Sequence, residues 1–150
     1  MSKLKPIPRR ERGQVLVWVA ILLPLFLALT GLVFDGGIMW QQYMRARWAA
    51  SAGCVAAASE IDPQVFQDTG RMVLKLPEAP QTAFNYAAWN DPDLYLTSVY
   101  VREENATQQI VAEGYTQIEP VFLRMFGVTG FRATVRAVER PAWGVVSAGE

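Results

Sequence analysis

The stretch that decides the fold runs from Gln14 to Phe34 and reads QVLVWVAILLPLFLALTGLVF. These twenty-one residues include no ionisable side chain. At about 1.5 Å per residue, a helix of this length measures about 32 Å, close to the ~30 Å hydrocarbon core of a bilayer. Arg12 and Asp35 bracket the stretch, and such charges cost about 2.5–3.5 kcal/mol each at mid-membrane. The stretch therefore predicts a transmembrane helix, bent near its middle by Pro24.

The charges on either side of this stretch set its expected direction. Residues 1–13 form a basic leader with five basic side chains and one acidic, whereas the other residues carry nine basic and thirteen acidic side chains. By the positive-inside rule, the N-terminus is expected in the cytoplasm and the C-terminal part outside, with a single pass through the cell membrane. A basic head on an acidic body also argues against nucleic-acid binding, because that function places the basic patch on the folded domain.

A cleavable secretory signal also has a basic head followed by an apolar run. In this chain the run is longer than the usual ~7–15 residues, and no A-x-A cleavage site follows it. The flanks of Arg9-Arg10 fit a twin-arginine signal poorly. We therefore expect a membrane helix that is retained.

The helix is expected to continue past the membrane. Residues 38–60 are rich in Ala, Met, Gln and Arg, which favour helix, and Pro63 is the first firm stop. The pair Gly36-Gly37 allows a bend, because glycine costs about 1 kcal/mol in a helix interior. One nearly continuous helix over residues 14–60 follows. Its outer half is then free to pack on its own domain or on neighbouring subunits.

Small residues dominate the end of this helix, and small side chains let another backbone approach closely. Helix propensity alone also explains an alanine-rich run, and Cys54 within it is expected to pack as a small apolar residue. Asp35 either pairs with an arginine of a neighbouring helix or marks the water interface. The residues expected to take part in helix packing are Pro24, Asp35, Gly36, Gly37, Ala49, Ala52, Gly53 and Ala56.

The order of these residues carries a family resemblance. It consists of Arg12-Gly13, Pro24, Asp35-Gly36-Gly37, Trp40, Arg45, Arg47 and the alanine-rich run from Ala49 to Ala58. Over about residues 9–60 the chain resembles TadE/TadG-like proteins, the minor pilin or pseudopilin-like components of tight-adherence (Tad, or Flp) pilus systems. The resemblance implies a minor pilin or membrane-anchored assembly component that acts structurally. Its implied partners are membrane lipid and other pilus or secretion-system subunits, reached through the N-terminal helix.

The sequence departs from the family pattern at the processing site. Precursors of pilin-like proteins in these systems resemble a glycine followed by an apolar helix with glutamate at its fifth position, which a prepilin peptidase reads. Here Gly13 precedes Gln14, and the fifth position is Trp18. Gly13 and Gln14 remain the candidate processing site, but the departure favours the uncleaved, TadG-like type.

Residues 61–141 are expected to form a small α+β domain, and residues 142–150 a tail. The fold predicted for the domain is a small antiparallel sheet with short helices, pilin-like in its attachment to a long N-terminal helix. The strictest alternation lies in 131–139, where Phe131, Ala133, Val135 and Ala137 point inward. The aromatic residues Tyr95, Tyr100, Tyr115, Phe122 and Phe126 are expected in the core. The expected elements are an edge strand at 71–76, a helix at 80–90, strands at 94–102, 108–116 and 131–139, and a short helix at 118–126.

The residues suggest no catalytic site, cofactor or metal. The chain has no histidine and a single cysteine, which excludes an internal disulfide, a His-based triad and most zinc sites. The acidic residues Asp91, Asp93, Glu103 and Glu104 lack the spacing of a calcium loop and favour turns. We therefore expect neither an enzyme nor a small-molecule substrate. The alternative to a pilus component is a membrane-tethered extracytoplasmic binding or sensing module.

Overall fold

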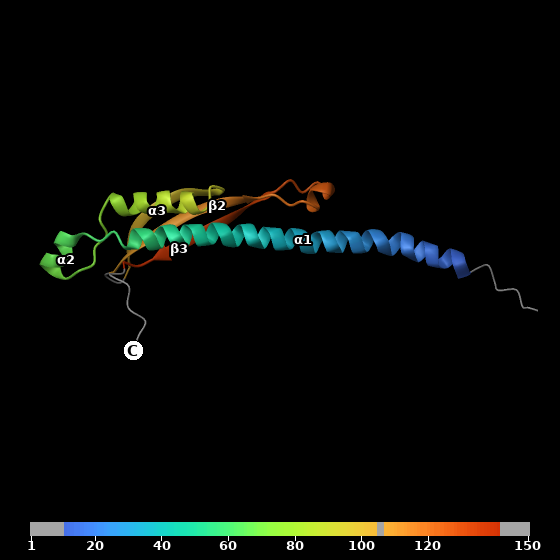
Figure 1. The fold of residues 1–150 in the computed structure, drawn as a ribbon, viewed down its shortest axis with the longest axis horizontal. Coiled ribbons are helices and arrows are strands. Elements are labelled where there is room, and N and C mark those ends of the chain that lie inside the picture. The colour runs from blue at the N-terminus through green and yellow to red at the C-terminus, as the bar shows by residue number, and fades with distance from the viewer. Residues whose placement is uncertain (1–10, 105–106, 142–150) are drawn as a thin grey trace, which may run out of the picture.

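The computed structural model describes residues 11–104 and 107–141. Most of the basic leader, the hairpin tip at 105–106 and the tail at 142–150 lie outside the described residues. The predicted α+β fold is confirmed: a long apolar helix is followed by short helices and a three-stranded antiparallel sheet (Figure 1).

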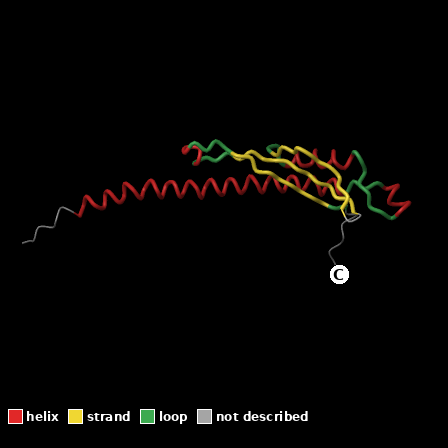
Figure 2. Tube along the Cα trace, turned by 180° about the vertical axis from the view of Figure 1, so that it is seen from behind, coloured by secondary structure: helices red, strands yellow, loops and turns green. Residues whose placement is uncertain are grey.

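Helix α1 (Glu11–Ala58) forms the axis of the molecule. Its 48 residues run unbroken through Pro24 and through Gly36-Gly37, which corresponds to about 72 Å of helix. In Figure 2 the sheet and the other helices gather along one end of α1, while the other end extends alone. The predicted continuous helix is therefore correct.

The segment after α1 differs from the prediction. Helix α2 (Pro63–Thr69) starts at Asp62, whose side chain accepts the N–H groups of Gln64 and Val65, and ends at Gly70 with φ of 68°. The predicted edge strand at 71–76 is wrong. Its backbone bonds instead to the turn between α1 and α2, where Asp62 N–H donates to the Val73 carbonyl, so only an isolated bridge forms.

The sheet has the order β1-β2-β3, with β1 (Leu94–Glu104), β2 (Thr107–Ile118) and β3 (Phe131–Glu139). The bounds of β3 are those predicted. In β1 the register shifts between Leu96 and Ser98. This bulge inserts one residue and reverses the alternation, so Leu96 before it and Val99 after it both pack on the core. The strand expected at 94–102 is therefore present, but its two faces exchange at the bulge.

The core lies where α1 and α3 (Glu78–Asn90) pack side by side against the sheet (Figure 1). Most of its side chains are alanines. A methyl group on Gly53 of α1 would collide with the Ala83 carbonyl oxygen of α3, which shows how closely the two backbones approach. The buried cluster comprises Ala46, Ala49, Ala50, Cys54, Ala57, Leu74, Ala79, Ala83, Ala87, Leu94, Ile110, Ala112, Val135 and Ala137.

The aromatic residues expected in the core lie largely outside it. Tyr95 is 54% exposed and stacks on Tyr115 with ring centroids 5.4 Å apart, and the Arg132 guanidinium lies over the Tyr115 ring. Phe122 and Phe126 lie beyond the end of the sheet, around the short 3-10 helix η1 (Leu123–Phe126). Because α1 and α3 pack closely on the inner face of the sheet, the space there admits chiefly small side chains such as alanine. The tyrosines therefore lie on the outer face.

Candidate functional site

The N-terminal half of α1 is an exposed apolar rod. Side chains around its whole circumference are accessible over residues 14–30, with Leu16 71% and Phe26 62% exposed. This part of α1 is long and apolar enough to cross a membrane. The helix is thus consistent with a single membrane span.

Asp35, at the end of this rod, binds a distant part of the chain. Its carboxylate oxygens accept three successive backbone N–H groups, from Val121 at 2.9 Å, Phe122 at 3.0 Å and Leu123 at 2.6 Å. These residues lead into η1, and the Asp35 side chain is fully buried. The Asp35 carboxylate is therefore not exposed to water in this structure, and its oxygens already accept N–H groups of its own chain.

Gly31, one turn before Asp35, and the adjacent Phe34 complete this contact. A Cβ atom on Gly31 would lie 2.9 Å from the Cβ atom of Phe122, so the glycine lets the phenylalanine reach the helix. The rings of Phe34 and Phe122 are 6.1 Å apart between centroids. Asp35 holds the backbone before η1, and Gly31 and Phe34 hold the Phe122 side chain.

Pro24 lies on a groove between α1 and η1. The groove has a volume of about 320 Å³ and an almost entirely apolar lining. It extends the contact of η1 along α1 toward the middle of the apolar stretch. Its lining residues are Pro24, Leu27, Ala28, Gly31, Leu32, Phe122, Leu123, Met125 and Phe126.

The remaining predicted packing residues divide into two groups. Ala49 and Gly53 are buried in the contact of α1 with α3 and the sheet, while Ala52 and Ala56 are half-buried. Gly36 and Gly37 are exposed, and a Cβ atom on either would meet no atom within 4 Å. Of the two alternatives left open for the outer half of α1, Ala49 and Gly53 follow the first, because they pack on α3 and the sheet of their own domain.

Gly13 and Gln14, the candidate processing site, lie in the first turns of α1 and are exposed. Trp18, at the fifth position, is exposed on the same helix. The described structure places no other element against Gly13.

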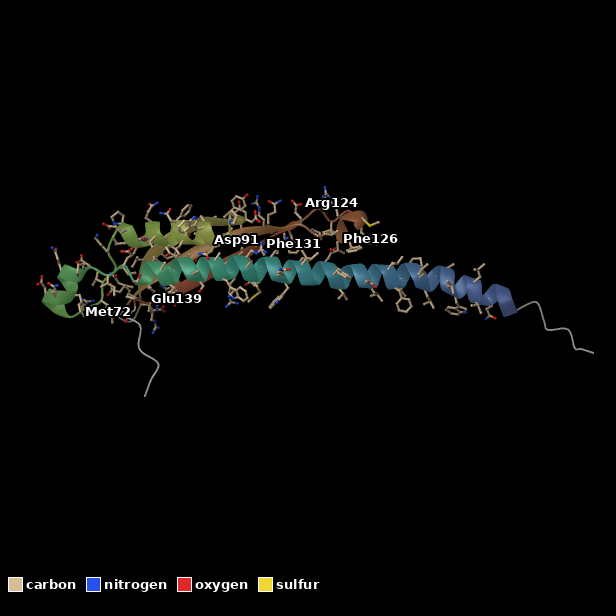
Figure 3. All side chains as sticks on the ribbon, viewed as in Figure 1. Met72, Asp91, Arg124, Phe126, Phe131 and Glu139 are labelled. Carbon is tan, nitrogen blue, oxygen red and sulfur yellow. The ribbon has the colours of Figure 1, made fainter. Side chains whose placement is uncertain are left out.

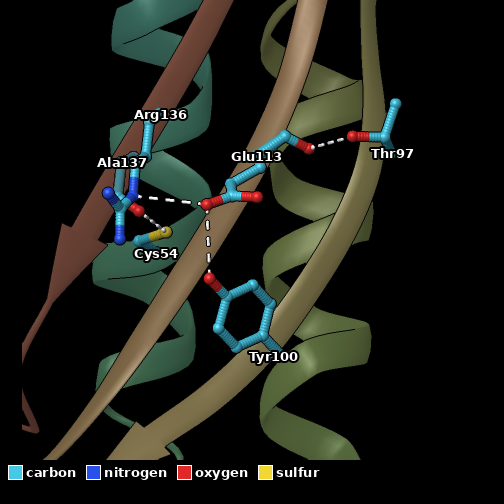
Figure 4. Close-up of polar contacts among 6 residues, drawn as sticks. All are labelled: Cys54, Thr97, Tyr100, Glu113, Arg136 and Ala137. Carbon is cyan, nitrogen blue, oxygen red and sulfur yellow. Dashed lines mark hydrogen bonds and ion pairs between the residues drawn. The ribbon is translucent and has the colours of Figure 1, made fainter.

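Cys54 is buried where α1 meets the sheet, and its thiol donates to the Ala137 carbonyl oxygen at 3.8 Å (Figure 4). Burial raises the pKa of this thiol to about 11, and the Glu139 charge acts in the same direction. The expected role of Cys54 as a packed apolar residue fits this position. On the far side of the sheet, Glu113 accepts from Tyr100 and pairs with Arg136 (Figure 4).

The structure does not bring the four acidic residues to a common site. Asp91 is buried and accepts the Asp93 N–H in a turn. Glu103 pairs with Arg71, and Glu104 pairs with Arg102. The carboxylates of Asp91, Glu103 and Glu104 therefore each make a local contact of their own.

Sequence reasoning missed the docking of η1 on α1. The available signal was the run of apolar residues from Val121 to Val128, interrupted by a single arginine, in a part of the chain otherwise read as core. Its partner Asp35 is 86 to 88 residues away, and no periodicity within either segment connects the two.

In a comparison with known proteins, the matching region lies within α1. Residues 13–54 match the model of the TadE-like protein family, and this range includes the exposed rod, Asp35 and the buried Ala46, Ala49 and Ala50. No curated protein and no solved structure matches the chain. Over residues 13–54 the chain is therefore similar to the TadE-like protein family.

Proposed function

We propose that the chain is a minor pilin or membrane-anchored assembly component of a Tad/Flp-type adhesion pilus. Residues 14–34 span the membrane, the basic leader is cytoplasmic, and the domain lies outside. The protein acts by packing against other subunits and performs no chemistry. The observation that carries this proposal is that one unbroken helix supplies both the apolar rod and part of the domain core.

This sharing of α1 supports a mechanical role. Ala50 and Cys54 are fully buried among α3 and the sheet, whereas Leu16 on the same helix is exposed. A displacement of the rod therefore moves the domain with it, without a hinge between them. The contact of Asp35 with η1 braces the helix at the point where it leaves the apolar stretch.

Two surfaces remain available to other subunits. One is the apolar rod itself. The other lies on α1 outside the membrane, where Trp40 is 66% and Trp48 67% exposed. Large aromatic side chains are enriched at protein interfaces, so these tryptophans support contacts with neighbouring helices.

Site-specific photocrosslinking in native membranes tests the proposal. A photoreactive amino acid replaces Leu23 in the rod or Trp48 on the outer part of α1, and Gln67 in α2 serves as the exposed control. We expect crosslinks from Leu23 and Trp48 to other Tad proteins, identified by mass spectrometry, and none from Gln67. Deletion of the gene is expected to abolish or shorten the pili seen by electron microscopy.

Normal pili in the deletion strain, with crosslinks to lipid alone, would overturn the proposal in favour of a tethered binding module. The intact mass of the chain from native membranes then separates the two kinds of pilus component. A chain that begins at Gln14 is a processed, pilin-like subunit, whereas a chain that keeps residues 1–13 is a permanent anchor.

A further inference from the structure

The loop between β2 and β3 returns to the apolar rod of α1. It contacts α1 at Gly31, Phe34 and Asp35, at the outer end of the apolar stretch. The groove that follows reaches Pro24, about 16 Å further along the helix. Figures 1 and 3 show this loop, with Arg124 and Phe126, beyond the end of the sheet and alongside α1. A bilayer around residues 14–34 therefore reaches the loop.

The side chains of the loop are apolar and exposed. Met125 is 83% and Phe126 71% exposed, and both lie beside the apolar groove. Val121, Phe122 and Val128 are also exposed. Contiguous apolar patches of this kind mark interaction sites in folded proteins, and this one is continuous with the membrane-spanning surface.

Backbone N–H groups of the loop have hydrogen-bond acceptors within the protein, as a bilayer environment requires. In a bilayer each unsatisfied N–H group is costly, so irregular backbone at that depth needs internal acceptors. Asp35 accepts three of the N–H groups, and carbonyl groups within the loop accept three more. The six donors are Val121, Phe122, Leu123, Met125, Gly127 and Val128.

The charge of the loop fits a lipid headgroup. Arg124 is the single ionisable residue between Pro120 and Phe131, and it is exposed. A long basic side chain can extend toward the surface while its neighbours enter the apolar layer.

We propose that residues 121–128 form a second membrane anchor, in which Met125 and Phe126 enter the outer leaflet beside α1 and Arg124 binds lipid phosphate. This inference rests on the membrane span of the proposed function. It commits to lipid as the occupant of the loop surface. With two points of insertion, the domain is fixed in its rotation about α1 as well as in its distance from the membrane.

Spin labelling of the full chain in vesicles of phosphatidylcholine and phosphatidylglycerol tests the proposal. In a Cys54→Ala background, a nitroxide is attached at Met125→Cys, at Leu23→Cys in the span, or at Trp89→Cys, an exposed position on α3. Accessibility to oxygen and to a water-soluble nickel chelate reports the depth of each label. We expect oxygen to dominate at 125 and 23, and the nickel chelate to dominate at 89.

The three labels separate the possible failures. A label at 125 that is as accessible to nickel as the one at 89, with 23 in lipid, would overturn the second anchor and leave the span intact. Nickel access at both 125 and 23 would overturn the span and the anchor together. Spin–spin broadening at 125 would show a second copy of the chain on the loop and would also overturn the proposal.

A matched pair of glycine variants tests how the loop is held. Gly31→Ala places a methyl group against Phe122, whereas Gly36→Ala places it where no atom lies within 4 Å. We expect Gly31→Ala to raise the mobility and nickel accessibility of the label at 125, and Gly36→Ala to leave both unchanged. An equal response to the two variants would contradict docking through Gly31.

Discussion

Asp35 is the residue on which the relation between helix and domain depends. Its carboxylate follows the apolar stretch directly, is buried, and accepts N–H groups that come 86 to 88 residues later in the chain. A buried carboxylate is stable only when such donors offset the loss of hydration. One side chain thus joins the end of the rod to the return loop of the sheet.

Replacement of Asp35 by alanine is expected to release η1 from α1. The N–H groups of Val121, Phe122 and Leu123 lose their acceptor, and each such loss costs about 1–3 kcal/mol when the group stays buried. Hydrogen–deuterium exchange of the detergent-solubilised protein checks this, with faster exchange expected at 121–123. Asp93→Ala, at an exposed turn, should leave those amides unchanged. If the amides of residues 121–123 stay protected from exchange in Asp35→Ala, then Asp35 does not hold η1 against α1.

Cys54 is expected to resist thiol reagents in the folded protein. Its pKa of about 11, against an ordinary value of 9.0, follows from burial and lowers the reactive thiolate fraction near pH 8 about a hundredfold. The thiolate then appears only as the pH rises toward 11. Labelling with a chromogenic disulfide should be slow until denaturant is added. Ser59→Cys in a Cys54→Ala background provides the exposed control, and a native Cys54 that reacts as fast as the thiol introduced at position 59 would contradict its burial.

Among the elements, the pair α1 and α3 is held by a seam of small side chains. Ala46, Ala50 and Ala57 of α1 face a core that includes Ala79, Ala83 and Ala87 of α3, all fully buried. Alanine loses no rotamer freedom when it is buried, and the close approach of two backbones gains many dispersion contacts. The stability of the contact between α1 and α3 therefore depends more on the close fit of the two helices than on the buried area of their side chains.

Two glycines of α1 are expected to respond in opposite directions to the same change. Gly53→Ala would force α1 and α3 apart, because its methyl group meets the Ala83 carbonyl oxygen and lies 3.0 Å from the Ala87 methyl group. Gly37→Ala meets no atom within 4 Å and favours helix by about 1 kcal/mol. Thermal unfolding followed by circular dichroism should show a lower midpoint for Gly53→Ala and a higher one for Gly37→Ala. A midpoint raised by both would mean that the seam is loose.

Much of the element pattern could be predicted from the sequence. Strict alternation from Phe131 to Glu139 and the unbroken helix-forming run of α1 each carry their own signal, and both were located correctly. Helix α2 was missed although Asp62, Pro63 and Gly70 provide its capping signals. The bulge after Leu96 and the pairing of 71–76 with the α1–α2 turn depend on contacts between distant segments, which local patterns do not contain.

The candidate site could be predicted only in part. The apolar rod was evident because its length and lack of charge are local properties. The aromatic residues expected in the core lie outside it, because the close packing of α1 on α3 and the sheet admits chiefly alanine. The contact of Asp35 with residues 121–123 could not be inferred, since a lone carboxylate after an apolar run is equally compatible with exposure to water.

At the scale of the whole molecule, the chain is a rod with a domain mounted along one end. The rod and the domain share α1, and the loop that carries η1 extends from the sheet back along the rod (Figure 2). Pro24 lies at the far end of the groove between them. Because proline lacks an N–H group, α1 has one helical hydrogen bond fewer at the end of this groove.

Pro24→Leu is expected to leave membrane insertion intact and to impair pilus assembly. Leucine restores a helical hydrogen bond, straightens the span and places a longer side chain in the groove. Alkali extraction of membranes measures insertion, and electron microscopy counts pili. Leu16→Val, on the exposed rod, is the matched apolar control. A normal number of pili in the Pro24→Leu strain would count against a role for the bend and the groove.

The position of β2 between β1 and β3 has a consequence for the order of events during synthesis. The chain emerges with α1 first, while β3 completes the cover over Cys54 only when residues up to 139 have arrived. Until then the side of the core around Cys54 lacks its third strand, and Asp35 gains its three donors only once residues 121–123 have been made. The late steps of folding are therefore the return of residues 121–128 to a helix made at the start and the pairing of β3 with β2. If the ribosome or translocon stalls before β3 has paired with β2, the anchored chain keeps an uncovered core around Cys54. A quality-control protease can recognise such a chain.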